Sequence, residues 1–553
     1  MTKKVIIVGG VAGGATAAGR LRRLDEKSHI IMFERGEHVS FANCGLPYYI
    51  GGAISKREKL LVQTVEAMSK KYRLDIRNLS EVVKINRDAK TVLVKNIKTG
   101  EQYEESYDDL LLSPGAKPVV PPIAGIAEAE QLFTLRNIPD TDRIKAFITE
   151  KQPKSAVVIG GGFIGVEMAE NLKELGLDVT LVEMANQVLA PLDYEMAAII
   201  RQKLSHHGIK VILEDGVQEL QENGRQIILK SGGKLAADMI VLSIGVKPEN
   251  KLAEDSGLTI GERGGIVVNQ YLQTSDPSIY AVGDAIEVTD CVSGKPALIP
   301  LAGPANRQAR IAADNISGRK KTYAGTLGTA VVKIFDYTAA STGNNEKTLR
   351  RYGMDYRTVH LHPGSHAGYY PGATPIHLKL LFTPDEGKIL GAQAIGKSGV
   401  EKRIDVIATA MKGGLTVFDL TNLELSYAPP YSSAKDPVNM AGYVAANIIE
   451  DGIKTIQWHE VDEVIQSGGL MLDVREPHEQ QGGMIENTRN IPLGQLRERL
   501  DELPKSEPIY IHCQVGLRGY LAVRILLDNG FDAVNVDGGW VTYSLATSAQ
   551  LIK

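Results

Sequence analysis

The sequence predicts an α/β protein of three or four domains, organised around two similar strand–turn–helix units. Its 553 residues are too many for a single hydrophobic core. A short apolar run followed by a glycine turn occurs at residues 5–14 and again at residues 156–165. After Trp458 a fresh alternation of apolar strands and helices begins. These observations indicate two nucleotide-binding units, a mixed region and a small C-terminal domain.

Composition narrows the function classes. The formal net charge is −4 and no long basic run occurs, which argues against nucleic acid or an acidic membrane surface as the main partner. The apolar run at residues 5–8 is too short for a signal peptide, and no stretch approaches the ~18 apolar residues of a membrane span. The only cysteines are Cys44, Cys291 and Cys513, which fits a chemical use of thiols in a reducing cytoplasm. We therefore expect a cytoplasmic protein without a metal, membrane or nucleic-acid partner.

The first unit runs from the strand at residues 5–8 through a glycine turn and a helix to a second strand, at residues 30–34. A glycine turn that opens a helix lets backbone N–H groups meet a pyrophosphate, and an acid at the next strand end accepts ribose hydroxyls. Val11 departs from this pattern because it replaces the middle glycine. The candidate cofactor contacts are Gly9, Gly10, Val11, Ala12, Gly13, Gly14, Glu34 and Arg35.

The second unit satisfies the whole nucleotide-binding pattern. Its helix carries an apolar stripe of Ile164, Met168, Leu172 and Leu175, at spacings of four, four and three. One glycine turn is weak evidence, but two in the same strand–helix context argue against a purely structural use of both. The candidate contacts here are Gly160, Gly162, Phe163, Ile164, Gly165 and Glu183.

A third sequence element indicates which nucleotide each of the two units binds. Residues 279–285 form a strand that ends in Gly283-Asp284 and resembles the second FAD fingerprint of the two-dinucleotide flavoprotein reductases. The resemblance implies that the first unit binds FAD and that residues 150–245 bind the nicotinamide. Glu183 would repel a 2′-phosphate, so we expect NADH to be favoured, with NADPH still open. The further contacts that the resemblance implies are Ser113, Pro114, Gly115, Gly245, Gly283, Asp284 and Ala302.

Residues 40–47 contain Cys44 at the place where this superfamily carries its redox-active sulfur. Many members have a Cys-x4-Cys pair there, but here Tyr49 stands at the second position. A lone sulfur that accepts two electrons needs a partner, either an external thiol in a mixed disulfide or an oxygen in a sulfenic acid. The residues around Cys44 alone leave both a reductase and an NADH oxidase or peroxidase open.

Thr16, Arg20 and Arg23 fall on one face of the first helix, where two arginines can form a phosphate fork. Together with Ser40 and Asn43 they resemble the coenzyme A disulfide reductases, and this resemblance covers residues 1–450. In that family the corresponding residues hold coenzyme A, as a tightly or covalently bound thiol, while it forms a mixed disulfide with the cysteine. A sulfur-reducing activity on low-molecular-weight thiols is therefore implied.

The resemblance continues through residues 425–437, which in the family reach across a homodimer to the partner's flavin and coenzyme A. Tyr427 and Lys435 match the family's contact types, and Tyr427 is also a candidate flavin contact. Asn306 is a plausible coenzyme A contact and Lys71 a weaker match, because the local alignment drifts. We expect Tyr369 to form a proton-donating pair with Tyr427.

The C-terminal domain resembles a rhodanese. Residues 509–513 read as a strand ending in Cys513, and a short loop then leads into a helix with Ala522, Val523 and Leu526. Successive backbone N–H groups around a sulfur at a helix start form an anion-binding nest that suits a persulfide. Residues 537–540 strengthen the match, although a docking module without activity stays an alternative. The persulfide loop comprises Cys513, Gln514, Val515, Gly516, Leu517 and Arg518.

The resemblances imply an α/β fold with two nested Rossmann-like dinucleotide-binding domains, an α+β dimerisation domain and a C-terminal α/β rhodanese domain. The expected boundaries are 1–149 with 246–325 for FAD, 150–245 for NAD(P)H, 326–453 for dimerisation and 454–553 for the rhodanese domain. The expected activity is reduction of coenzyme A disulfide, coenzyme A persulfide or polysulfide. The alternatives are an oxidase or peroxidase with a Cys44 sulfenic acid, and a flavin-bearing sulfur carrier or redox sensor.

Overall fold

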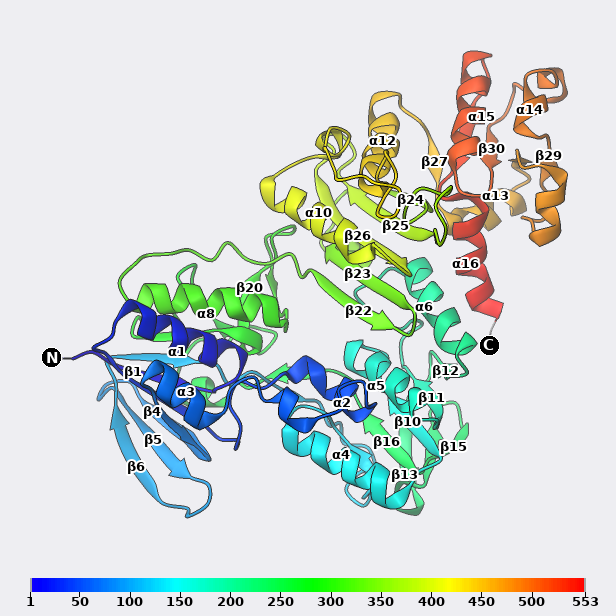
Figure 1. The fold of residues 1–553 in the computed structure, drawn as a ribbon. Helices are drawn as coiled ribbons and strands as arrows, with labels where there is room; N and C mark the ends of the chain where they lie inside the picture. The colour runs from blue at the N-terminus through cyan, green and yellow to red at the C-terminus, as the bar shows by residue number, and fades with distance from the viewer. Residues whose placement is uncertain (1, 552–553) are drawn as a thin grey trace. The chain divides into compact units, whose positions relative to one another are not determined.

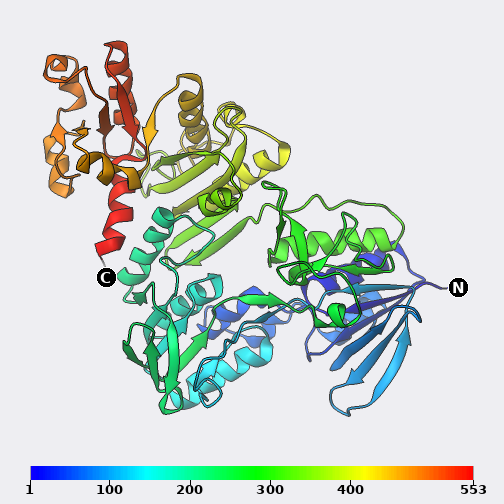
Figure 2. The same cartoon turned by 180° about the vertical axis from the view of Figure 1, so that it is seen from behind.

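The computed structural model describes residues 2–551, so the expected outer boundaries at residues 1 and 553 lie outside the described residues. The chain divides into two compact units, which Figures 1 and 2 show from opposite sides. Unit 1 comprises Met1–Asn186 and Gly208–Gly328. Unit 2 comprises Gln187–His207 and Thr329–Lys553.

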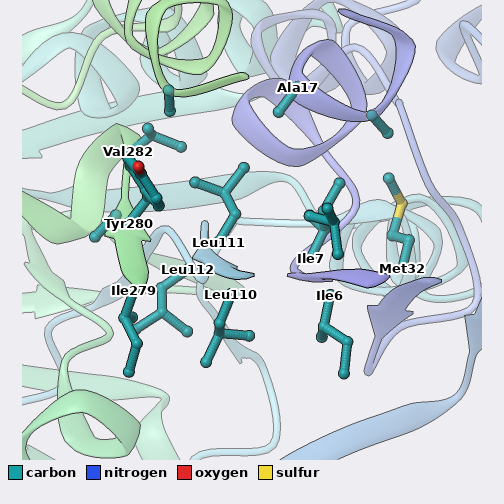
Figure 3. Packing of buried hydrophobic residues seen from close by; sticks show 14 of the residues in the cluster. Ile6, Ile7, Ala17, Met32, Leu110, Leu111, Leu112, Ile279, Tyr280 and Val282 are labelled. Atoms are coloured by element: carbon teal, nitrogen blue, oxygen red, sulfur yellow. The ribbon is translucent and has the colours of Figure 1, made fainter. Parts of the chain in front are cut away.

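The first sheet of unit 1 is parallel, with strand order β19-β7-β1-β2-β3. Its strands other than the polar edge strand β3 are largely buried and apolar on both faces, as is usual for parallel sheets that helices cover. The close view in Figure 3 shows Ile6, Ile7, Leu111 and Val282 within this core. The elements are β1 (Lys4–Val8), α1 (Ala12–Leu24), β2 (His29–Glu34), β3 (Asp75–Asn78), β7 (Asp109–Leu112), β19 (Ile279–Ala281) and α8 (Ala302–Ile316).

The second parallel sheet of unit 1 has the order β12-β11-β10-β16-β9. Met168 and Leu172 on its first helix are buried, as the apolar stripe predicts. Leu175 is an exception, because it lies one residue beyond the helix and is exposed. The elements are β9 (Leu132–Phe133), β10 (Ser155–Ile159), α5 (Phe163–Glu174), β11 (Asp178–Val182), β12 (Lys210–Ile212) and β16 (Met239–Leu242).

Smaller elements complete unit 1. One antiparallel sheet contains β4 (Ser80–Asn86), β5 (Thr91–Asn96) and β6 (Gln102–Ser106). A second antiparallel sheet contains β13 (Val217–Gln221), β14 (Gln226–Leu229) and β15 (Lys234–Ala236). A small sheet pairs β8 (Ala116–Pro118) with β17 (Val246–Pro248). Another small sheet contains β18 (Ile266–Val267), β20 (Ile286–Thr289) and β21 (Pro296–Ala297). The remaining α-helices are α2 (Leu46–Ile50), α3 (Val65–Tyr72), α4 (Ile138–Lys151) and α7 (Lys251–Asp255).

Unit 2 is built on an antiparallel sheet with the order β22-β23-β26-β25-β24. Strands β25 and β26 are buried along their whole length. The helix α6 (Tyr194–His206) belongs to this unit although it follows β11 in the chain. The other elements are β22 (Ala330–Ile334), β23 (Tyr337–Gly343), α9 (Glu346–Arg351), β24 (Arg357–Leu361), β25 (Ile376–Phe382), β26 (Ile389–Gly396), α10 (Val400–Gly413), α11 (Val417–Leu420) and α12 (Pro437–Glu450).

The C-terminal part of unit 2 is a parallel sheet with the order β27-β31-β30-β28-β29. One buried apolar cluster includes residues of this sheet and of the antiparallel sheet, so the two parts share a core. No described helix is long and apolar enough to cross a membrane. The elements are β27 (Thr455–Ile456), α13 (Val461–Gln466), β28 (Leu470–Asp473), β29 (Arg489–Asn490), α14 (Leu493–Leu496), β30 (Ile509–His512), α15 (Leu517–Asp528), β31 (Ala533–Val536) and α16 (Gly539–Leu551).

Candidate active site

The first glycine turn joins β1 to α1 through close backbone contacts. Gly9 has φ +95°, and a Cβ there would lie 2.1 Å from the carbonyl oxygen of Ser113. A Cβ at Gly14 would lie 1.8 Å from the carbonyl oxygen of Gly9. The N–H of Gly10 donates to Glu34 Oε2 at 2.8 Å, which holds the carboxylate beside the turn. The turn therefore requires glycine, and it places an acid at the helix start as a ribose-binding site needs.

The second turn repeats this geometry. Gly160 has φ +106°, and the N–H of Gly161 donates to Glu183 Oε2 at 2.7 Å. At Gly162 and Gly245, by contrast, a Cβ would meet no atom within 4 Å. This open space lies beside the start of α5, so the residues present fit a pyrophosphate that approaches the backbone. At the corresponding place in the first turn, Val11 is the residue that precedes α1.

The Gly283-Asp284 segment lies at the carboxyl end of β19, where Gly283 N–H donates to Gln308 Oε1 of α8 at 2.8 Å. Helices α1 and α8 pack together, so both FAD-type motifs meet at one edge of the sheet. Burial raises the pKa of Asp284, and Arg136 opposes this rise. Arg136 also donates to the carbonyl oxygen of Pro114 at 3.1 Å. A crevice edge of this kind is where open α/β sheets bind ligands, so the residues fit a flavin nucleotide.

Cys44 lies on a short 3₁₀ turn, Asn43–Gly45, directly before α2. Its side chain is exposed, yet loss of hydration to nearby protein atoms raises the pKa of the thiol. The carboxyl groups of Glu167 and Asp284 raise this pKa further. The surroundings of Cys44 in the chain alone therefore favour the protonated thiol.

Glu167 is a further group beside Cys44, and the sequence motifs do not single it out. Glu167 lies on α5, two residues after the last glycine of the second turn, and it accepts a hydrogen bond from Tyr48 at 3.1 Å. Burial raises the pKa of Glu167 to about 6, the Tyr48 hydroxyl opposes this, and Glu170 raises it. The signal was present in the sequence, since Glu167 and Glu170 are acids in the mainly apolar first part of α5. A carboxyl group that titrates near neutral pH is a candidate for proton transfer.

The residues expected to contact coenzyme A differ in their availability. The Thr16 hydroxyl donates to the Asn306 side-chain oxygen, so these two groups meet. Arg20 is paired with Asp314, at 2.6 Å from Arg20 Nη2 to Asp314 Oδ1, and is therefore already neutralised. Arg23 is exposed. The expected fork thus consists of one paired and one solvent-facing arginine.

The other expected coenzyme A contacts in unit 1 are close to solvent. Asn43 and Lys71 are exposed, and the Lys71 ammonium lies 5.2 Å from the Tyr72 ring centre. Ser40 has φ 47°, an uncommon value for a residue with a side chain. Its backbone is held by the N–H bond to Gly10 O at 2.9 Å. The positive φ of Ser40 thus lies in the segment that also carries Cys44, where local strain is typical of functional sites.

In unit 2 the hydroxyl groups of Tyr369 and Tyr427 lie 2.7 Å apart. The two phenols thus form a hydrogen bond, while their role as proton donors stays a prediction. Both side chains are exposed, Tyr369 at 76% and Tyr427 at 47%, and Lys435 is also exposed. The hydrogen bond with Tyr427 raises the pKa of Tyr369. A phenol that remains protonated can donate to a leaving thiolate.

Cys513 is buried at the end of β30 and the start of the loop before α15. Its Sγ accepts the N–H of Gly516 at 3.2 Å, which is a contact that the nest prediction requires. The Cys513 carbonyl oxygen accepts the N–H of Trp540 at 2.8 Å. A Cβ at Gly539 would lie 2.4 Å from this oxygen, so glycine is needed where the two segments meet.

The charged groups around the Cys513 loop are paired. Arg518 donates to both carboxylate oxygens of Glu479, each at 2.6 Å, and this bond holds the pKa of Glu479 at about 2. Arg475 and Asp473 form a fully buried pair at 2.9 Å. The ring nitrogens of His512 are buried without a hydrogen-bond partner among the described residues, and burial lowers the pKa of this side chain to about 4. The loop therefore presents backbone N–H groups rather than free cations to a sulfur anion.

Three segments match known families. Residues 3–309 match the pyridine nucleotide-disulphide oxidoreductases, residues 329–437 the dimerisation domain of the same family, and residues 457–546 the rhodanese-like domain. A coenzyme A disulfide reductase of Staphylococcus haemolyticus is 42% identical over 447 residues, which cover 81% of this chain and 100% of that protein.

Two solved structures span almost the whole chain. The reduced CoADR-RHD of Bacillus anthracis is 60% identical, has a TM-score of 0.98 and covers 99% of both chains. A NAD-dependent persulfide reductase from A. fulgidus is 39% identical, has a TM-score of 0.91, and the match covers 98% of this chain and 100% of that chain. The chain therefore belongs to the coenzyme A disulfide reductases of the pyridine nucleotide-disulphide oxidoreductase family, in the form that carries a C-terminal rhodanese domain.

Proposed function

We propose that the protein is an FAD- and NAD(P)H-dependent reductase of coenzyme A disulfide, coenzyme A persulfide or polysulfide, acting through a Cys44–coenzyme A mixed disulfide. The observation that carries this proposal is the solitary position of Cys44. The other cysteine of unit 1, Cys291, lies after β20 and donates to the carbonyl oxygen of Ala324 at 3.1 Å. Because Cys44 has no protein thiol to pair with in the described part of unit 1, we infer that the second sulfur comes from the substrate.

When bound, FAD supplies two-electron transfer from the nicotinamide to sulfur. The chain holds the cofactors through the residues of the two glycine turns, with Glu34 and Glu183 as ribose acceptors. Ser113, Pro114, Gly115, Asp284 and Ala302 belong to the FAD side, and Gly245 to the nicotinamide side. We assign residues 1–149 with 246–325 and residues 150–245 to these two domains.

One disulfide bond is broken for each hydride that is transferred. Two electrons and one proton reduce the mixed disulfide to the Cys44 thiolate and free coenzyme A thiol. The Cys44 thiolate then attacks the next coenzyme A disulfide, which restores the mixed disulfide and releases a second thiolate. A phenol of the Tyr369–Tyr427 pair donates the proton that this leaving thiolate needs. With a persulfide, the released species is hydrogen sulfide instead.

The nucleotide preference depends on Glu183. Its carboxylate accepts N–H groups from Gly161 and Ala185 at 2.7 and 2.8 Å, so a 2′-phosphate would meet a fixed negative charge. We infer a preference for NADH over NADPH. Replacing Glu183 with alanine is expected to bring the ratio of kcat/KM for NADH to kcat/KM for NADPH closer to one. A preference of the native protein for NADPH would contradict this inference.

The C-terminal domain, residues 454–553, is proposed to take up sulfane sulfur on Cys513 and to pass its outer sulfur to coenzyme A or to Cys44.

We also propose a homodimer, formed through residues 326–453, in which the exposed Tyr427 and Lys435 serve the partner's Cys44 site. None of the three cysteines forms a disulfide within the described chain, which supports a reducing compartment, the cytoplasm.

The mass of the purified protein tests the mixed disulfide. The protein is denatured without reductant, and the peptide that contains Cys44 is weighed before and after treatment with dithiothreitol. A coenzyme A adduct that the reductant removes supports the proposal. A Cys44 peptide that carries one extra oxygen, with consumption of oxygen or of hydrogen peroxide during NADH turnover, would instead identify an oxidase or a peroxidase respectively.

A further inference from the structure

A cluster of charged side chains is buried in unit 2. Lys379 on β25 is fully buried, and its ammonium group contacts the carboxylates of Asp193, Glu195 and Glu346. Three carboxylates this close together could hold a metal ion. Here the Lys379 ammonium occupies the position between them, so the cluster is an ion-pair network and not a metal centre.

Two residues of the rhodanese domain join this cluster. The buried ring of His360 on β24 contacts Glu195 Oε1 through Nε2 at 3.1 Å, and Asp537 Oδ2 through Nδ1 at 2.6 Å. The backbone N–H of His360 also donates to Asp537, at 3.1 Å. Trp458 Nε1 donates to the second oxygen of Glu195 at 3.3 Å. Asp537 and Trp458 therefore connect the rhodanese domain to the buried charges of α6 and of the antiparallel sheet in unit 2.

The contacts of His360 define its charge. Both ring nitrogens face carboxylate oxygens, and an ionised carboxylate only accepts hydrogen bonds, so both nitrogens must carry a proton. Burial opposes a charge on His360, but Asp537 and Glu195 outweigh this effect and raise its pKa to about 9. With Lys379, Lys347 and Arg350, an imidazolium at His360 balances the four carboxylates of the cluster.

The segment after Asp537 connects this cluster to Cys513. A Cβ at Gly538 would lie 2.8 Å from His360 Cβ, and one at Gly539 would lie 2.4 Å from the Cys513 carbonyl oxygen. Trp540 N–H donates to that oxygen at 2.8 Å, and Val541 N–H donates to the carbonyl oxygen of Gln514 at 3.0 Å. His360 thus contacts one end of a short segment, residues 537–541, whose other end holds the persulfide loop.

We propose that His360, as an imidazolium paired with Asp537, is a positioning residue that fixes the Cys513 loop on the dimerisation domain. It does not touch the sulfur, and it acts through residues 537–541. This inference rests on the proposed function in that Cys513 is taken as the acceptor of sulfane sulfur. The positioning contact itself concerns only the two side chains and the backbone between them.

The contact should be sensitive to pH. The groups that face His360 are Asp537 before α16, Glu195 on α6 and Lys379 on β25, and His362 lies two residues further along β24. Because the folded-state pKa of His360 is raised, its stabilising effect is complete below about 6.5 and is lost as the pH rises through about 9. Burial keeps His362 neutral, since its pKa is well below the ordinary value, so it adds no second transition there.

Tryptophan fluorescence reports on this contact directly. The chain has two tryptophans, and both lie beside the contact, Trp458 on Glu195 and Trp540 at the persulfide loop. The full-length holoenzyme is titrated from pH 7 to about 10 while emission is recorded. We expect a transition near pH 9 in the native protein and none in His360→Gln. The matched control is Tyr356→Phe, which removes a hydroxyl bond to Glu346 at 2.7 Å elsewhere in the cluster.

Sulfur uptake gives the functional readout. The protein is mixed with inorganic polysulfide at pH 7, and the mass of the Cys513 peptide is followed over time. His360→Gln and Asp537→Asn are expected to slow the added-sulfur signal about tenfold, because the loop loses its fixed orientation. Reduction of coenzyme A disulfide should change less than twofold, and Tyr356→Phe should behave as the native protein. Hydrogen exchange at residues 537–541 should become faster in both variants.

The outcomes separate this inference from the proposed function. Unchanged sulfur uptake together with unchanged hydrogen exchange in His360→Gln overturns the positioning role. If the native protein takes up no sulfur on Cys513, the proposed role of the domain fails, while the fluorescence transition and the exchange still decide the contact. Asp537→Asn keeps a hydrogen-bonding side chain, so it provides the same test if His360→Gln does not fold.

Discussion

The two reactive cysteines have opposite surroundings. Cys44 is exposed on a short 3₁₀ turn, and the carboxyl groups of Glu167 and Asp284 disfavour its thiolate. Cys513 is buried, and a backbone N–H from Gly516 points at its sulfur. The persulfide loop therefore directs a hydrogen-bond donor at its sulfur, whereas burial and the nearby carboxyl groups favour the protonated thiol at Cys44. The difference indicates that the chain itself stabilises a sulfur anion at Cys513, while a thiolate at Cys44 is expected to depend on charges that bound ligands bring.

The largest expected effect is at Cys44. Cys44→Ser should retain FAD but lose reduction of coenzyme A disulfide and persulfide by about 10³-fold or more, because no mixed disulfide can form. Steady-state NADH oxidation with each substrate measures this loss. Cys291→Ser is the control from the same unit and should remain active. A Cys44→Ser protein that keeps most of its turnover would remove the proposed mechanism.

The second effect separates the two sites. Cys513→Ser should slow turnover with polysulfide or a protein persulfide by about a hundredfold at low substrate, because covalent delivery of sulfur from the same chain is lost. Coenzyme A disulfide reduction should stay nearly unchanged. Hydrogen sulfide release with each substrate is the measurement. Full polysulfide turnover in the variant would show that the rhodanese domain serves only for docking.

A smaller effect is expected from the phenol pair. Tyr427→Phe should lower kcat for coenzyme A disulfide about tenfold, because the leaving thiolate loses one proton donor while Tyr369 remains. Tyr370→Phe is the matched control, since this neighbouring tyrosine is outside the Tyr369–Tyr427 hydrogen bond. Sulfur uptake on Cys513 should not respond to either change. Equal kcat values in the three proteins would exclude the pair from proton transfer.

The smallest effect concerns the pKa of Cys44. Glu167→Gln removes a negative charge that raises this pKa, so the pKa should fall and alkylation by iodoacetamide should accelerate at neutral pH. The alkylation rate of the Cys44 peptide is measured by mass spectrometry across pH 5–10. Glu174→Gln, at the exposed end of the same helix, serves as the control. If the pH dependence of Cys44 alkylation were unchanged or shifted to higher pH in Glu167→Gln, Glu167 would not be a cause of the raised pKa of Cys44.

Features that depend on local backbone geometry could be predicted from the sequence. Gly9 and Gly160 need positive φ at a strand–helix turn, and the loop from Cys513 to Arg518 needs its short length, so each leaves a readable pattern. The parallel pairing of β1 with β2 and of β10 with β11 follows the same local logic, since a strand, a turn and a helix precede the second strand of each pair.

Pairings between distant residues could not be predicted from the sequence. Tyr48 and Glu167 are 119 positions apart, Arg20 and Asp314 are 294 apart, and His360 and Asp537 are 177 apart. Each pairing depends on which helix faces crowd together after folding, and neither partner lies in a motif that names the other. Arg20 illustrates the difficulty, because its helical spacing with Arg23 indicates a free phosphate ligand and gives no sign of Asp314.

The core shared by the antiparallel sheet and the rhodanese sheet has an evolutionary consequence. The staphylococcal relative is fully covered by 81% of this chain, so a reductase of this family can exist without the rhodanese part. Here, however, apolar side chains on both sides of the junction pack into one cluster, with Ile453 among them. Joining two genes end to end would leave that apolar surface unmatched. The two parts of the fused form are therefore expected to be inherited and lost together.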